Sequence, residues 1–304
     1  MDLINSLAVI FAIIFIGIIC AKRSIFNTTQ IEAFEIFLFK IALPCYLFNS
    51  TFSYNLSTLI NVKYIASYFL SFCIIAIITV FLSYKKEQVS TICIKILSSA
   101  YINAAIYSLP VITYLLEDPT AAIIGNLLQV IIIQPILITI LGIINHKEKS
   151  ITNRIITSIS TPIVATPIVG LLLNYSQINI YPAIILIVQN LGNGASNIAL
   201  FSFGLALGSI KFSTIKLDKN LLQITGMKNI IHPLIAFCVG KYIFHLEKYW
   251  LHSLIIIASA PTAYIVYIIS KQFSIKVELV KNVIAISSVI SLMILILMCL
   301  VIKP

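Results

Sequence analysis

The sequence SAPTAY, residues Ser259–Tyr264, lies in the middle of an apolar run that extends from residue 250 to residue 270. A proline inside a helix removes one backbone hydrogen bond and displaces the carbonyl four residues earlier, which here belongs to Ile257. In lipid, such a break is tolerated only where protein or a water-filled cavity satisfies the freed groups. We therefore expect a broken helix at Pro261, with its interrupted backbone facing the protein interior or a cavity.

A second apolar run, from residue 98 to residue 116, repeats this pattern of polar residues followed by a proline. Its polar residues and proline are Asn103, Tyr107, Ser108 and Pro110. This proline lies 151 positions before Pro261 in a chain of 304 residues. Two interrupted helices at corresponding places in two halves of a membrane protein indicate a transporter's binding site. The two runs therefore predict a site that is built from a pair of broken helices.

Composition places the chain among integral membrane proteins. Hydrophobic residues make up 60% of the chain and charged residues only 10%, with a mean hydropathy of +1.06, whereas a soluble globular protein has about 25% charged residues. The net charge of +10 does not indicate nucleic-acid binding, because the basic residues are spread over successive loops. We expect a multi-pass protein of the cell membrane that contacts the lipid bilayer and no nucleic acid.

Cysteine and histidine give no sign of metal or catalytic chemistry. The six cysteines lie in apolar runs without close pairs, which is typical of small core residues. The four histidines lack a metal-ligand spacing, such as two histidines four residues apart on one helix. No nucleophile and base form a recognisable pair. The sequence therefore favours a protein that is not an enzyme and that has no metal or cofactor.

A membrane-spanning helix needs roughly 20 mostly apolar residues, and the sequence has ten such segments joined by short loops. We expect these spans at Leu3–Ala21, Ile31–Asn49, Ile60–Tyr84, Ile92–Leu116, Thr120–Asn145, Ile156–Tyr175, Tyr181–Ser209, Ile224–Phe244, Trp250–Ser270 and Val280–Ile302. The predicted fold is an all-α integral membrane protein with ten transmembrane helices. It divides into a five-helix repeat at residues 1–145, a cytoplasmic linker at 146–155 and a second five-helix repeat at 156–304.

Positive charge predicts the direction of these spans, because Lys and Arg gather in cytoplasmic loops. The loops assigned to the cytoplasm hold fifteen basic residues: Lys22, Arg23, Lys85, Lys86, Lys95, Lys147, Lys149, Arg154, Lys211, Lys216, Lys219, Lys228, Lys271, Lys276 and Lys281. The opposite side holds four: Lys63, Lys241, Lys248 and Lys303. Both termini are therefore predicted outside the cytoplasm. Since five is odd, the second half enters from the opposite face, which predicts inverted repeats whose fourth and ninth helices are the broken ones.

Acidic residues are missing from the interiors of the predicted spans. All ten carboxylates lie at or near helix ends or in loops, whereas proton and sodium pathways usually hold an acid or a histidine at depth. This distribution argues against an antiporter with a paired-aspartate site. It leaves open a sodium ion held by backbone carbonyls and by Asn or Ser side chains.

The broken helices favour the binding of an anion. Proline suits the first position of a helix, so Pro110 and Pro261 are each expected to start a half-helix whose N-terminal N–H groups carry a partial positive charge. Two such ends near the middle of the bilayer would hold a carboxylate. The predicted lining residues are the donors Asn103, Ser108, Ser259 and Thr262 and the amphipathic Tyr107 and Tyr264. The alternative is that the two prolines merely kink packed helices.

Two further spans carry polar or small residues of interest. The seventh span holds three asparagines and a glutamine between residues 189 and 197. Because polar groups in lipid need partners or water, we expect Asn193 and Asn197 to face protein or the substrate path. In the same span, Gly204 and Gly208 indicate close packing against another helix. Lys40 lies inside the second span, where it either extends toward the cytoplasmic face or balances the charge of an anionic substrate.

Four stretches carry a resemblance to a known family. They are IALP at residues 41–44 with Leu47-Phe48, Asn103 through Pro110, Leu191 through Gly208, and Ala260-Pro261 through Phe273. Together they resemble the auxin efflux carrier family, which includes plant PIN-type carriers and bacterial permeases for malonate and related acids. The chain departs from the family pattern at residues 107–109, where a glycine commonly precedes the proline. It also lacks the long central loop of many plant carriers.

The resemblance implies an architecture and a mechanism. It implies inverted five-helix repeats with crossed fourth and ninth helices, a scaffold of the first, second, sixth and seventh helices, and a mobile transport unit formed by the others. It also implies an organic-anion substrate at the crossing, elevator-like alternating access and often a homodimer. Asn103 matches the crossover asparagine of the family.

We therefore expect a secondary transporter, a permease or efflux carrier, that moves a small carboxylate, with H⁺ or Na⁺ as the candidate coupling ion. A sodium-coupled symporter of the bile-acid type has the same crossed-helix plan and stays open as an alternative. A channel or a non-transporting membrane scaffold is a third hypothesis, although the sequence has no acidic ring or filter-like segment.

Overall fold

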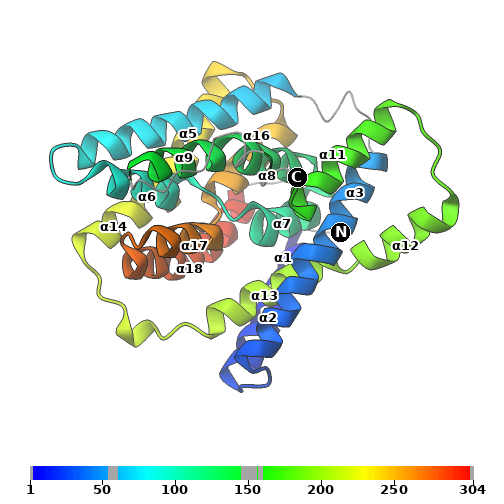
Figure 1. Ribbon diagram of the computed structural model, residues 1–304, viewed down its shortest axis with the longest axis horizontal. Coiled ribbons are helices and arrows are strands. Elements are labelled where there is room, and N and C mark those ends of the chain that lie inside the picture. The colour runs from blue at the N-terminus through cyan, green and yellow to red at the C-terminus, as the bar shows by residue number, and fades with distance from the viewer. Residues whose placement is uncertain (1–2, 54–60, 145–155, 157–159, 302–304) are drawn as a thin grey trace. The chain divides into compact units, whose positions relative to one another are not determined.

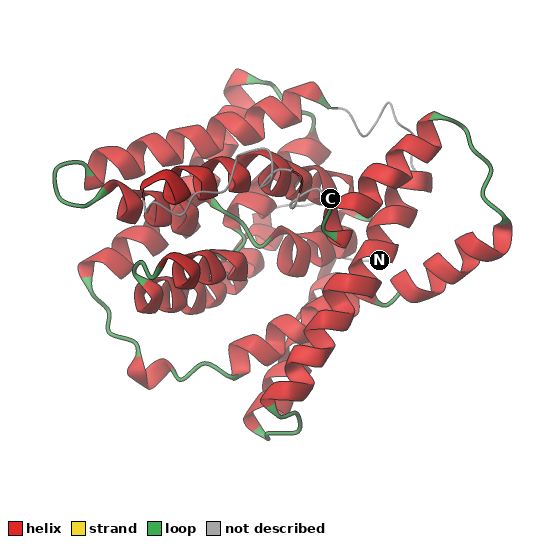
Figure 2. Cartoon of the chain, in the orientation of Figure 1, coloured by secondary structure: helices red, strands yellow, loops and turns green. Residues whose placement is uncertain are grey.

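A computed structural model of the chain describes residues 3–53, 61–144, 156 and 160–301. Within these residues the regular elements are helices and no strand is present (Figure 2), so the all-α prediction is confirmed. In this described part of the chain, six helices are long and apolar enough to cross a membrane: Ile4–Lys22, Val62–Ser83, Thr120–Ile144, Pro182–Gly208, Lys219–Ile243 and Val277–Met298. The number of ten spans and their inverted arrangement stay predictions.

The chain forms two compact units, each assembled from three separate stretches. The first unit contains Met1–Asn61, Ala105–Ile131 and Ile155–Ile210, and the second contains Val62–Ala104, Ile132–Arg154 and Lys211–Pro304. The predicted linker at residues 146–155 lies outside the described residues. The predicted division into halves at that linker stays a prediction.

The helices of the first unit pack closely around small residues. They are α1 (Leu3–Lys22), α2 (Thr28–Phe37), the π-helical η1 (Leu38–Ala42), α3 (Leu43–Ser53), α7 (Leu109–Leu116), α8 (Thr120–Leu128), α11 (Pro162–Tyr175), α12 (Pro182–Gly192) and α13 (Ala195–Gly208). Helices α1 and α13 run side by side (Figure 1). A Cβ atom added at Gly204 would lie 2.2 Å from the carbonyl oxygen of Ile14, and one at Gly208 would lie 2.8 Å from that of Ile18. The predicted packing role of this glycine pair is confirmed.

The second unit contains the residues at which both helices are interrupted, 101–103 and 260–263. Its helices are α5 (Val62–Ser83), α6 (Val89–Ala100), α9 (Gln134–Ile144), α14 (Lys219–Gly226), η5 (Met227–Ile231), α15 (His232–Cys238), η6 (Val239–Ile243), α16 (Lys248–Ser259), α17 (Tyr264–Phe273) and α18 (Val277–Val301), with the short η4 (Phe212–Thr214). Helix α6 ends at Ala100 and the chain becomes helical again at Ala104, in η2 (Ala104–Ser108), which continues into α7. Helix α16 ends at Ser259 and α17 begins at Tyr264.

The prolines do not start the half-helices, contrary to the prediction. Pro110 is the second residue of α7, after the helix has already begun in η2. Pro261 lies in an extended segment and not at the start of α17. Because proline disfavours the helical conformation of the residue before it, Ala260 is extended, with φ −61° and ψ 154°. Pro261 therefore ends a helix, whereas the first break lies several residues before Pro110.

Two lysines that the charge count assigns to loops lie buried in helices. Lys95 is in α6 and is 3% exposed, with its Nζ 2.7 Å from Glu87 Oε1 and 2.8 Å from Asn220 Oδ1. Lys228 is in η5 and is fully buried. Neither lysine therefore counts as a cytoplasmic loop charge, and the orientation of the termini stays a prediction.

Candidate functional site at the two helix breaks

The two helix breaks pair with each other through short extended segments in the second unit. We call residues 101–103 and 260–263 the crossing segments. Ile102 and Thr262 form an isolated antiparallel bridge. The backbone N–H of Asn103 donates to the carbonyl of Pro261 at 2.9 Å, and that of Ala263 donates to the carbonyl of Tyr101 at 3.4 Å. The breaks are therefore paired with each other through their backbones.

Side chains from neighbouring helices hold the crossing in place. The hydroxyl of Thr262 donates to the carbonyl of Ser98 in α6 at 2.6 Å, and its backbone N–H donates to Ser287 Oγ in α18 at 3.2 Å. Thr262 is fully buried and Ser259 is 1% exposed. The hydroxyl of Ser259 donates to the carbonyl of Ile256 at 2.8 Å. Both hydroxyl groups, which the sequence predicts as substrate contacts, thus bond to the backbone of the helix breaks in this structure.

Helix α16 ends inside the protein, yet each of its last four carbonyl groups accepts a hydrogen bond. The last four carbonyls of a helix have no partner within that helix. In α16 these are the carbonyls of residues 256–259, and they accept from Ser259 Oγ, Ala260 N, Lys228 Nζ and Ser291 Oγ in that order. The bond from Lys228 is 2.9 Å long and the bond from Ser291 is 2.6 Å long. Two of the four partners therefore come from other helices.

Sequence reasoning missed Lys228, although a signal was available. This lysine is the fifth residue of the span predicted at Ile224–Phe244, so it lies within an apolar run. The structure places it in η5, which packs against α16. A lysine inside a predicted span that has no acidic residue nearby in sequence is a functional candidate on that ground alone.

The N-terminal end of α17 is the part of the crossing that suits an anion. Its N-cap residue, Ala263, supplies no side-chain hydrogen bond. The first N–H groups of a helix have no partner within that helix and carry a partial positive charge. Tyr264, the first residue of α17, is 52% exposed and its ring lies 5.4 Å from that of Tyr267. Asn103 is half-buried at the end of the opposite crossing segment.

The other predicted site residues belong to the first unit. Tyr107 is fully buried, with its ring edge-on to Phe203 at 5.3 Å, and Ser108 and Pro110 are buried beside it in sequence. Asn193 is exposed, and Asn197 accepts a hydrogen bond from the hydroxyl of Tyr114. Lys40 lies in η1 and is exposed, which leaves both of its interpretations open. The structure thus groups Asn103, Ser259, Pro261, Thr262 and Tyr264, and the joining of these two sets in one site stays a prediction.

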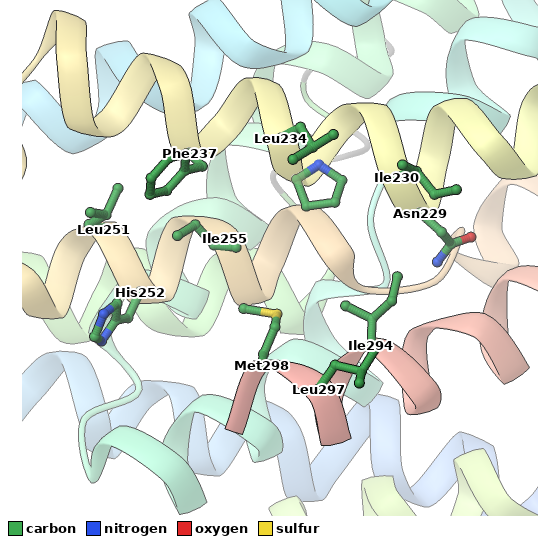
Figure 3. A pocket seen from close by; sticks show the side chains of 11 residues that line it. Asn229, Ile230, Leu234, Phe237, Leu251, His252, Ile255, Ile294, Leu297 and Met298 are labelled. Atoms are coloured by element: carbon green, nitrogen blue, oxygen red, sulfur yellow. The ribbon is translucent and has the colours of Figure 1, made fainter. Parts of the chain in front are cut away.

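A cavity of about 470 Å³ lies in the second unit between η5 and α15, α16 and α18 (Figure 3). Asn229 and His252 lie at opposite ends of it, and the other nine lining residues are apolar. Its described lining therefore includes no lysine, arginine or carboxylate. This apolar lining does not match the requirements of a small anion, so the cavity is not the predicted site.

The composition, the apolar helices and the paired helix breaks define a multi-pass membrane protein. The family model described as "Membrane transport protein" matches residues 2–299, so the chain belongs to this family of transporters, the auxin efflux carrier family. The match covers nearly the whole chain and confirms the resemblance found in the four sequence stretches. It is a family of transporters and not of enzymes. No match is found among curated proteins.

Proposed function

We propose that this protein is a secondary transporter that carries a small organic anion, of the carboxylate class, and that it binds the anion at the crossing segments. The single observation that carries the proposal is the pairing of the two helix breaks through the Ile102–Thr262 bridge. Interrupted helices create backbone groups that can bind a solute only where the chain leaves the helix. Membership of a transporter family supports transport as the activity.

The chemistry of the crossing favours an anion as the substrate. The N-terminus of α17 directs its first N–H groups and their partial positive charge toward the break. The opposite pole, at the end of α16, is occupied by the ammonium of Lys228 and the hydroxyl of Ser291. The side chain of Asn103 provides an amide donor that suits a carboxylate oxygen. Tyr264 would form one wall of the site.

Alternating access completes the proposal. The anion would be exposed to one side of the membrane at a time, by elevator-like movement of the crossing against a scaffold that includes the closely packed α1 and α13. The same proposal includes a homodimer formed through the scaffold. It also places six further residues along the substrate path: Asn193, Asn197, Tyr107, Ser108, Pro110 and Lys40. The alternative of a sodium-coupled symporter of the bile-acid type makes a different prediction about cations, which we address below.

The test is binding and uptake of mono- and dicarboxylates by purified protein in proteoliposomes. A thermal-shift screen with and without sodium would first identify the anion that is bound. Replacing Asn103 with Ala should then weaken binding of this anion and slow its uptake by at least about tenfold, because one charge-assisted hydrogen bond contributes about 1.5–3 kcal/mol. Asn27→Ala is the matched control, since Asn27 only caps the N-terminus of α2. Wild-type affinity and uptake in Asn103→Ala protein would refute the assignment.

A further inference from the structure

The C-terminal ends of α6 and α16, which meet at the crossing segments, accept hydrogen bonds from two different kinds of side chain. The carbonyl of Ser98, near the end of α6, accepts from the neutral hydroxyl of Thr262 at 2.6 Å. The carbonyl of Ala258, near the end of α16, accepts from the ammonium nitrogen of Lys228 at 2.9 Å. A helix C-terminus carries a partial negative charge, which a cation stabilises. Of these two contacts, only the one at α16 comes from a basic side chain.

The surroundings of Lys228 match this role. The side chain is fully buried, and within the described residues no carboxylate lies within salt-bridge distance of it. A buried ammonium group is costly unless charges or dipoles compensate for its lost hydration. The carbonyl at the end of α16 is its hydrogen-bond acceptor. His232, one helical turn later, is also buried and supplies no negative charge. The end of α16 is therefore the compensating group.

This position matters because transporters with broken helices use it to bind ions. In such folds, unwound carbonyls and the C-terminal ends of half-helices coordinate the coupling sodium ion. Here a carbonyl at that end already accepts from Lys228, and the next carbonyl, that of Ser259, accepts from Ser291 Oγ. A sodium ion at the end of α16 would have to displace both of these hydrogen-bond partners.

We propose that the buried amino group of Lys228 takes the place of a coupling sodium ion at the end of α16, so that the protein binds its anion without sodium. Lys228 acts as a positioning residue: its charge stabilises the broken end of α16 and thereby the crossing segments that hold the substrate. The inference rests on the proposed function for the identity of the substrate. It goes beyond that proposal in excluding the sodium-coupled alternative.

The experiment compares wild-type protein with Lys228→Gln and Lys228→Arg in two measurements. The first is the melting temperature in sodium chloride and in choline chloride at equal concentration, without substrate. The second is the affinity for the carboxylate that stabilises wild-type protein, again in both salts. We expect no sodium-specific change in either measurement for wild-type protein. We expect Lys228→Gln to bind the anion about tenfold more weakly, while Lys228→Arg stays within about threefold of wild type.

Each contrary result has a distinct meaning. A sodium-specific rise in the wild-type melting temperature, or anion binding that requires sodium, would overturn the inference, and this wild-type comparison decides even if Lys228→Gln fails to fold. Equal anion affinity in folded Lys228→Gln and wild type would overturn it as well, because a neutral hydrogen-bond donor would then suffice. If wild type binds no carboxylate, the proposed function fails. In that case the melting temperatures still test the role of Lys228. The inference is supported if Lys228→Gln lowers the melting temperature more than Lys228→Arg does and sodium has no specific effect.

Discussion

Ile102 and Thr262, which lie 160 positions apart, form an antiparallel bridge between the two helix breaks, both of which lie in the second unit. The neighbouring bond from Asn103 N to Pro261 O is 2.9 Å long. The bridge makes the two breaks depend on each other, because each extended segment gives the other partners for backbone groups that its own helix does not satisfy. A change that weakens one break should therefore weaken both.

Thr262→Val should destabilise the crossing while preserving the shape of the side chain. The variant loses the buried bond from the Thr262 hydroxyl to the carbonyl of Ser98, and it leaves that carbonyl without this donor. An unsatisfied buried group costs about 1–3 kcal/mol, so the melting temperature of purified protein should fall. Thr262→Ser keeps the hydroxyl and is the control. Equal melting temperatures for the Val and Ser variants would contradict a role for this bond.

Ser291→Ala should loosen the end of α16. The hydroxyl of Ser291 donates to the carbonyl of Ser259 at 2.6 Å and accepts from Asn229 Nδ2 at 2.8 Å. Its loss should lower the melting temperature and also reduce anion affinity, because it leaves a carbonyl at the break with one partner fewer. Ser288→Ala, on the same helix, is the matched control, since the Ser288 hydroxyl donates to the carbonyl of Ile284 in its own helix. Similar losses in both variants would argue against a specific effect at the break.

Gly204→Ala should separate α1 from α13 in the first unit. The added methyl group would lie 2.2 Å from the carbonyl oxygen of Ile14, so one backbone has to move. We expect a loss of about 1–3 kcal/mol in stability, as for other overpacked interiors, measured as a lower melting temperature. Gly226→Ala is the control because a Cβ atom added there would have no neighbour within 4 Å, and in a helix this change is neutral or stabilising by up to about 1 kcal/mol. Unchanged stability of the Gly204 variant would contradict the close packing.

Lys95→Met should be more harmful than the double change Lys95→Met/Glu87→Gln. The ion pair joins side chains that are 4% and 16% exposed, with Nζ and Oε1 2.7 Å apart. Removing one partner of a buried pair costs about 3 kcal/mol, because the remaining charge is left without compensation, whereas removing both charges costs less. Melting temperatures of the two single variants and the double variant give the coupling energy. Additive losses would show that the pair makes no specific contribution.

Sequence patterns predict the class of protein and the presence of two breaks, but not where the helices end. Apolar length and sparse charge follow directly from the lipid environment, so the all-α membrane fold is predictable. Proline locates the break at Pro261 correctly, because the residue before a proline avoids the helical conformation. Pro110 does not mark the position of the first break. That break is stabilised by hydrogen bonds to residues about 160 positions later, and no local sequence pattern encodes such contacts.

Charge patterns are a poorer guide to individual residues. Lys95 and Lys228 are assigned to loops because the count of basic residues per loop treats all lysines near a span boundary alike. Their burial depends on partners that are distant in sequence: Asn220 for Lys95 and the carbonyl of Ala258 for Lys228. Thr262 and Ser259 lie at the crossing, yet their hydroxyls bond to the backbone. The long-range hydrogen bonds decide which polar residues stay available for a substrate.

A cryo-electron microscopy map of the protein with the carboxylate that raises its melting temperature most would show where the anion binds. We expect density for this anion in contact with the first turn of α17 and with the side chain of Asn103. Density for the anion elsewhere, for example in the apolar cavity between α15, α16 and α18, with empty space at the crossing segments, would contradict it.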